Sequence, residues 1–129
     1  MASSKRKHSG IERELARALT HACEAAKAEI VGFQWLTHQV DYMHFPQSLL
    51  VTWVFDSDTN MAQASNGHYY DRAVELTLAA FADIGISVSS GAAHVRFDSQ
   101  QRCDALHGGD WETRLNLQQR SAGKHGKRH

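Results

Sequence analysis

The stretch FQWLTHQVDYMHFPQSLLVTWVF, residues 33–55, decides the predicted fold because it holds two strand-like segments separated by a turn. Residues 33–42 are rich in aromatic and β-branched residues and partly alternate with polar ones, which favours a β-strand. Residues 49–55 are apolar on both alternating faces, as in an interior strand. Phe45-Pro46-Gln47-Ser48 supplies the turn, so the stretch predicts a β-hairpin.

Two amphipathic helices are expected on either side of this hairpin. Ser9-Gly10-Ile11-Glu12 has the spacing of a capping box, which predicts a helix that begins at Ser9. Apolar residues then recur at helical spacing up to Ile30, and Gly32 supplies a stop. The same spacing over residues 69–84 predicts a second helix that ends at Gly85.

The last third of the chain adds further short elements. Residues 86–88 and 92–97, joined by Ser-Ser-Gly, are expected to form a second hairpin. The tripeptide Phe-Asp-Ser ends a predicted strand twice, at 55–57 and at 97–99, where Asp or Ser can cap the segment that follows. The predicted fold is therefore α+β, a small antiparallel sheet with packed helices in the order α-β-β-α-β-β-α.

Capping residues also organise the region around Gly108-Gly109. Asp98 and Gln101 have capping-box spacing, so residues 100–106 are expected to be helical. Asp110 at a helix start would repel a phosphate, and it is better explained as the N-cap of residues 111–120. The favoured interpretation of the glycine pair is a joint between two packed helices.

A helix-turn-helix is the alternative interpretation of the same region. Ala105, Gly109 and Leu115 fall at its usual small, glycine and apolar positions, and Arg114 and Arg120 would be its main basic groups. Asp104 and Gln118, however, fall where that motif places buried apolar residues. Asp110 and Glu112 would also face the DNA phosphates.

The charge of the chain is divided between a body and two tails. The 129 residues include 14 basic and 14 acidic ones, for a net charge of zero. All the acidic residues lie between Glu12 and Glu112, together with seven of the basic ones, so the body carries 7 − 14 = −7 and the tails carry +7. The expected organisation is a disordered basic tail over residues 1–8, one α+β domain over 9–119 and a second disordered basic tail over 120–129.

The tails are the strongest indication of a partner, because short basic runs attract polyanions through counterion release. The alternative is that they only solubilise the protein or fold back on the acidic body. The residues expected to contact nucleic acid are Lys5, Arg6, Lys7, Arg120, Lys124, Lys127 and Arg128.

No reaction is indicated by the sequence, and we expect neither catalytic residues nor a metal or other cofactor. The motifs GxSxG, GxxxxGKS, GxGxxG, HExxH and CxxC are all absent. A small enzyme that uses His38, Asp41 and His44, or Cys103, remains an alternative. Cys103 lies in the first turns of a helix, where its pKa could be lowered.

The cellular compartment is predicted from the cysteines and from the apolar segments of the chain. The two cysteines lie far apart, and no apolar segment follows the basic start, which favours a reducing, cytoplasmic compartment. The longest apolar runs are too short to span a bilayer, so no membrane partner is expected.

The segments GFQWLTHQVDY, FPQSLLV, VFD and HGGDW resemble a small family of bacterial proteins of similar length that are often labelled Fis-family transcriptional regulators. The resemblance covers roughly residues 11–115. It implies a regulatory role and assigns no function to any residue.

Three functional hypotheses follow. The first is a non-enzymatic regulatory or accessory protein that associates through its tails with nucleic acid, with RNA or a ribonucleoprotein favoured over a specific DNA site. The second is a protein-interaction module whose acidic body binds a basic partner or, through edge strands, another copy of itself as a homodimer. The third is a DNA-binding transcriptional regulator that uses the helix-turn-helix-like C-terminal pair.

Overall fold

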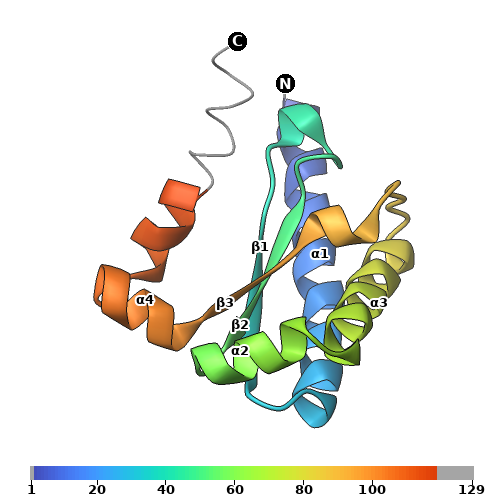
Figure 1. Ribbon diagram of the computed structural model, residues 1–129. Helices are drawn as coiled ribbons and strands as arrows, with labels where there is room; N and C mark the ends of the chain where they lie inside the picture. The colour runs from blue at the N-terminus through green and yellow to red at the C-terminus, as the bar shows by residue number, and fades with distance from the viewer. Residues whose placement is uncertain (1, 119–129) are drawn as a thin grey trace.

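A mixed three-stranded sheet lies at the centre of the molecule, in the order β1-β2-β3 (Figure 1). The strands are β1 (Phe33–Gln39), β2 (Leu50–Phe55) and β3 (Val95–Ser99), in a computed structural model that describes residues 2–118. β1 and β2 pair antiparallel, with Leu36 opposite Trp53, and the predicted hairpin is thereby confirmed. The α+β class is confirmed as well.

The predicted second hairpin is wrong, and with it the purely antiparallel sheet of four strands. β3 pairs parallel to β2, with Trp53 opposite Phe97. The connection from β2 to β3 runs through α2 (Asp58–Ser65) and α3 (His68–Asp83), and a helical crossover of this kind returns the chain to the same end of the sheet. Residues 86–88 are not a strand, because Ile86 and Val88 pack against the core from a loop.

The first helix also differs from its prediction. α1 (Ala2–Glu29) begins seven residues before Ser9, so the capping box is not its start, and residues 2–8, expected to be disordered, belong to its first turns. No proline interrupts this segment, and Gly10 lies inside the helix. The predicted end is confirmed, because Gly32 follows the helix with a φ of 82°. The predicted tail at 120–129 lies outside the described residues.

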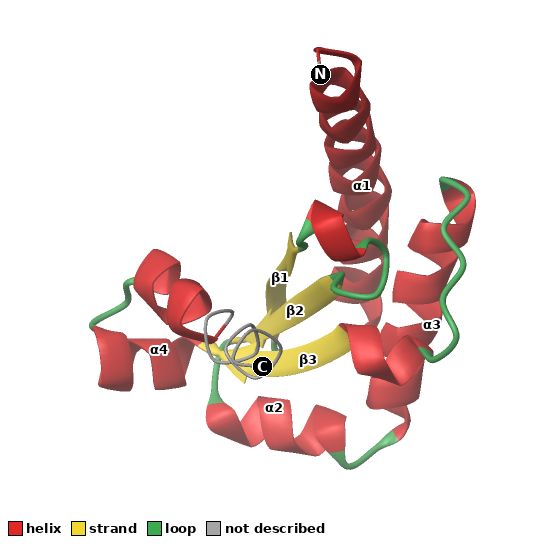
Figure 2. Cartoon of the chain, turned by 90° about the horizontal axis from the view of Figure 1, so that it is seen from above, coloured by secondary structure: helices red, strands yellow, loops and turns green. Residues whose placement is uncertain are grey.

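Helices cover both faces of the sheet (Figures 1 and 2). α1 and α3 pack on one face, where the Trp53 indole N–H donates to Thr77 Oγ1 over 3.2 Å. On the other face lie α4 (Gln100–His107) and a helix over residues 111–118. There the rings of Trp35 and Trp111 pack edge to face with centroids 5.0 Å apart. The sheet is therefore the middle layer of three.

One hydrophobic cluster joins the helices to the sheet. Its largest fully buried side chains are Trp53, Phe55, Phe81, Leu15 and Leu19. None of the helices in the described part of the chain is long and apolar enough to cross a membrane.

Both copies of Phe-Asp-Ser end a strand and begin a helix. Ser57 Oγ accepts the amide of Asn60 at the start of α2, and Ser99 Oγ accepts the amide of Arg102 at the start of α4. The predicted capping box of Asp98 and Gln101 is wrong, because Ser99 is the N-cap and Asp98 is buried against a helix that comes later in the chain.

The predicted cap at Asp110 is confirmed. Asp110 Oδ1 accepts the amide of Thr113 at 3.1 Å, at the start of the helix over 111–118. Gly108 and Gly109 precede it with φ values of 59° and 84°, in the left-handed region that favours glycine. The glycine pair therefore makes the turn that lays this helix on the sheet.

Candidate functional site

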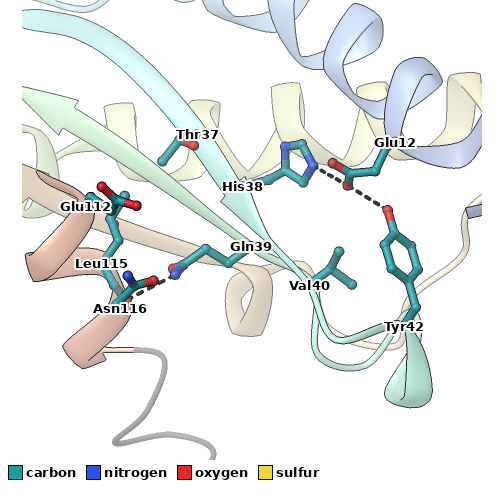
Figure 3. A pocket seen from close by; sticks show the side chains of 9 residues that line it. All are labelled: Glu12, Thr37, His38, Gln39, Val40, Tyr42, Glu112, Leu115 and Asn116. Carbon is teal, nitrogen blue, oxygen red and sulfur yellow. Dashed lines mark hydrogen bonds and ion pairs between the residues drawn. The ribbon is translucent and has the colours of Figure 1, made fainter. Parts of the chain in front are cut away.

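A groove with a volume of about 510 Å³ runs beside β1, between α1 and the helix over residues 111–118 (Figure 3). Its base is the end of β1, from Thr37 to Val40. Glu12 and Tyr42 line one side, and Glu112, Leu115 and Asn116 line the other. Three segments that are far apart in sequence therefore build this site.

The α1 side of the groove is organised around one carboxylate. Glu12 Oε1 accepts hydrogen bonds from Tyr42 OH at 2.6 Å and from His38 Nε2 at 2.9 Å (Figure 3). The His38 side chain is 15% exposed and that of Glu12 is 48% exposed, so the carboxylate stays accessible from the groove while the histidine is mostly covered. The helix that was expected to start at Ser9 instead presents Glu12 to the edge of the sheet.

The same contacts shift two pKa values in opposite directions. Partial burial raises the pKa of the Glu12 carboxyl, but the hydrogen bonds from Tyr42 and His38 outweigh it, and the net pKa is lowered. Burial and the neighbouring carboxylate raise the pKa of Tyr42. Glu12 is therefore an anion at neutral pH, held between two donors.

The opposite side of the groove is joined to β1 by one amide. Gln39 Nε2 donates to the Leu115 carbonyl oxygen at 3.0 Å. Glu112 and Asn116 are exposed on the same helix, and Leu115 is half-buried between them and the strand. This side offers a second carboxylate, an amide and an apolar contact.

Behind the groove, a buried ion pair fastens the helix over 111–118 to β3. The Arg114 guanidinium donates to both carboxylate oxygens of Asp98, at 2.7 and 2.9 Å. Burial raises the pKa of Asp98, but the hydrogen bonds from Arg114 and the Ser99 amide outweigh this effect, so the net pKa is lowered. Arg114, expected to be a main basic group of a helix-turn-helix, is 6% exposed and holds its own helix in place instead.

The residues predicted to contact nucleic acid fall at the ends of the chain. Residues 5–7 lie in the first turns of α1, whereas Arg120, Lys124, Lys127 and Arg128 lie outside the described residues.

The candidate enzyme residues are not gathered into one site. His44 Nδ1 contacts Asp41 Oδ2 at 3.1 Å on the surface, whereas His38 pairs with Glu12. Cys103 is fully buried, and this burial raises the pKa of its thiol, so the expected lowering is wrong. Within residues 2–118 no group of three or more potential ligands is placed to hold a metal ion.

Sequence reasoning named His38 as a candidate residue but missed Glu12, the carboxylate that His38 and Tyr42 share. Glu12 lies 26 residues before His38 and 30 before Tyr42, so no local spacing connects them. The sequence analysis assigned Glu12 to a capping box, so its role was explained by residues next to it in the sequence. The one available signal was its position beside the apolar stripe of the helix, next to Ile11.

Comparisons of the chain with family models, with curated proteins and with solved structures found no match. The resemblance to proteins labelled as Fis-family regulators stays a prediction.

Proposed function

We propose that this protein is a non-enzymatic cytoplasmic accessory protein that associates with RNA or a ribonucleoprotein through basic residues at its two ends. The contacts come from Lys5, Arg6 and Lys7 at the start of α1 and from the four basic residues of 120–129. The proposal is supported by which basic residues of the described part of the chain form ion pairs and where the others lie.

Three of the seven basic residues in the body are paired with carboxylates. Arg72 Nε lies 2.8 Å from Glu29, Arg114 lies 2.7 Å from Asp98, and Arg102 lies 3.6 Å from Asp58. A guanidinium that is already paired gives little additional attraction to a phosphate. No ion pair is found within residues 2–118 for the other four, which are Arg13, Arg17, Lys27 and Arg96.

The observation that carries the proposal is the position of two of these four residues on α1. Arg13 and Arg17 are both exposed on α1. Helical spacing puts them one turn apart, and it puts position 6 two turns before Arg13 on the same stripe. Figure 2 shows the first turns of α1 extending beyond the rest of the described fold. Residues 5–7 are thus continued by a basic stripe along a projecting helix.

RNA is favoured over a specific DNA site for two reasons. Direct reading of base edges needs donors on an element that enters the major groove, and Arg114 of the C-terminal helix is buried. A projecting basic helix on an acidic body instead suits contacts to a phosphate backbone, which carry no sequence information.

A salt titration of binding tests the proposal on the full chain. The probe is a fluorescein-labelled single-stranded RNA of mixed sequence, compared with duplex DNA, and binding is followed by anisotropy. Replacing Lys5, Arg6 and Lys7 together by Gln is expected to weaken binding and to reduce the slope of log K against log salt by about 0.7 for each phosphate that is no longer neutralised. Replacing Arg13 and Arg17 by Gln should reduce it further.

Lys27→Gln is the matched control, because this exposed lysine lies at the other end of α1. A slope that is unchanged in the triple variant, or reduced equally by Lys27→Gln, contradicts the proposal. So does a full chain that binds neither probe.

A further inference from the structure

The outer edge of β1 lies open along the groove. β1 pairs with β2 on one side, and no described strand lies on its other side. An edge strand presents backbone N–H and C=O groups with which an extended segment of another chain can pair. The groove, about 510 Å³ in volume, leaves room for a short extended segment beside Thr37, His38 and Val40.

Successive residues of β1 face the two opposite sides of this groove. His38 points toward α1, where it contacts Glu12, whereas Gln39 points the other way and donates to the Leu115 carbonyl. Figure 3 shows the two side chains leaving the strand in these directions. A segment that pairs with β1 follows the same alternation, so its adjacent side chains also face opposite sides.

Each side of the groove carries one carboxylate. Glu12 is held in position by Tyr42 and His38 on the α1 side, and Glu112 is exposed on the helix over 111–118. Two cations on adjacent residues of an added strand would reach one carboxylate each. Cations two residues apart would both face the same side and leave the other carboxylate unpaired. Val40 and Leu115 offer apolar contacts to the flanking residues.

We propose that the outer edge of β1 binds, by strand addition, an extended segment of a basic partner protein in which two basic residues are adjacent. The recognition elements are the backbone of β1 together with Glu12 on one side and Glu112 on the other. This surface acts independently of the nucleic-acid contacts proposed above, because it lies on the acidic body and uses different residues.

Two labelled octapeptides of identical composition test the alternation on the full chain. The first, TVTKRVTV, has adjacent basic residues; the second, TVKTRVTV, has them two apart. Fluorescence anisotropy at about 150 mM salt, where long-range attraction is screened, is expected to show binding of the first at least about fivefold tighter than of the second. N-methylation of alternate backbone nitrogens in the first peptide should abolish its binding, because strand pairing needs those donors.

Charge variants identify the two recognition residues. Glu12→Gln and Glu112→Gln are each expected to weaken binding of the first peptide by roughly fivefold. Glu14→Gln is the matched control, since this glutamate is exposed on α1 and does not line the groove, and it should leave binding unchanged. Circular dichroism confirms that each variant is folded.

Several results would overturn this proposal. Equal binding of the two peptides, equal loss in Glu14→Gln, or unchanged binding after N-methylation would show a non-specific attraction of cations. Absence of binding to either peptide would also overturn it. If the protein instead forms dimers that Glu112→Gln dissociates, the occupant of the groove is a second copy rather than a basic partner.

Discussion

At the scale of single residues, two buried threonines of similar burial differ in what their hydroxyls contact. Thr77 Oγ1 accepts the Trp53 indole N–H, whereas Thr52 Oγ1 has no hydrogen-bond partner among the described residues, although neither residue is more than 1% exposed. A buried polar atom without a partner loses its hydrogen bonds to water, and no hydrogen bond within the protein offsets this cost. Removing the hydroxyl of Thr52 therefore measures the free-energy cost of burying it without a partner. Removing the hydroxyl of Thr77 measures the loss of a buried hydrogen bond.

Thr52→Val is expected to stabilise the protein by roughly 1 kcal/mol, because it replaces an unpaired hydroxyl with a methyl group of similar size. Thr77→Val should destabilise it by about 1–3 kcal/mol, because it leaves the Trp53 N–H without an acceptor. The free energies of unfolding in urea, followed by tryptophan fluorescence, give both values. Equal destabilisation by the two changes would contradict this account.

At the scale of elements, the two helices that follow parallel strands begin with the same tripeptide but in different surroundings. Ser99 is fully buried, caps α4 and also contacts Asp58 through its hydroxyl. Ser57 is half-buried and caps α2. Ser99 thus serves two elements at once and links the starts of α2 and α4.

Ser99→Ala should cost more stability than Ser57→Ala. Loss of the N-cap alone costs about 1 kcal/mol, and Ser99→Ala in addition leaves Asp58 with one donor fewer. The measurement is chemical unfolding of both variants, with Ser65→Ala as a control, since this exposed serine bonds only a carbonyl within its own helix. If Ser57→Ala costs as much as Ser99→Ala, the link between α2 and α4 adds nothing.

Local patterns predicted the elements better than their arrangement. The hairpin, α3 and the Asp110 cap rest on residues close in sequence, so periodicity and turn residues sufficed. The parallel pairing of β3 depends on the long crossover between Phe55 and Val95, which no local pattern encodes. The groove was missed for the same reason, since Glu12, His38 and Glu112 meet only through the tertiary fold.

At the scale of the whole molecule, the helix over 111–118 depends on a charged contact to the sheet. Both partners are buried, with side chains 8% exposed at Arg114 and 3% at Asp98. A buried pair of this kind contributes while both groups are charged, and breaking it leaves one charge unpaired in the interior. The attachment of the C-terminal helices is therefore coupled to the protonation of Asp98.

Stability is expected to fall in acid. The pKa of Asp98 is lower in the folded protein than its ordinary value of 3.8, so its contribution is present above that pH and is lost as the pH falls through the lowered pKa. The pKa of Glu12 is also lowered from its ordinary value of 4.5, so its contribution to stability is likewise lost as the pH falls through the lowered pKa. Urea unfolding at a series of pH values measures the decline.

Asp98→Asn tests the source of this dependence. The variant should lose roughly 3–5 kcal/mol at neutral pH, because Arg114 is left without its anion. Its stability should then vary less with pH below about 4 than that of the unchanged protein. A variant whose pH dependence is as steep as before would show that Asp98 does not govern the acid sensitivity.

The parallel pairing of β3 also affects the order in which the protein can fold during synthesis. β1 and β2 are close in sequence and can pair as soon as residue 55 has left the ribosome, whereas β3 ends at residue 99. Until then β2, which is apolar except for Thr52, has an unprotected edge toward other nascent chains. The chain reaches that edge only after α2 and α3 have been synthesised, so a ribosome that stalls between β2 and β3 would expose a segment prone to aggregation.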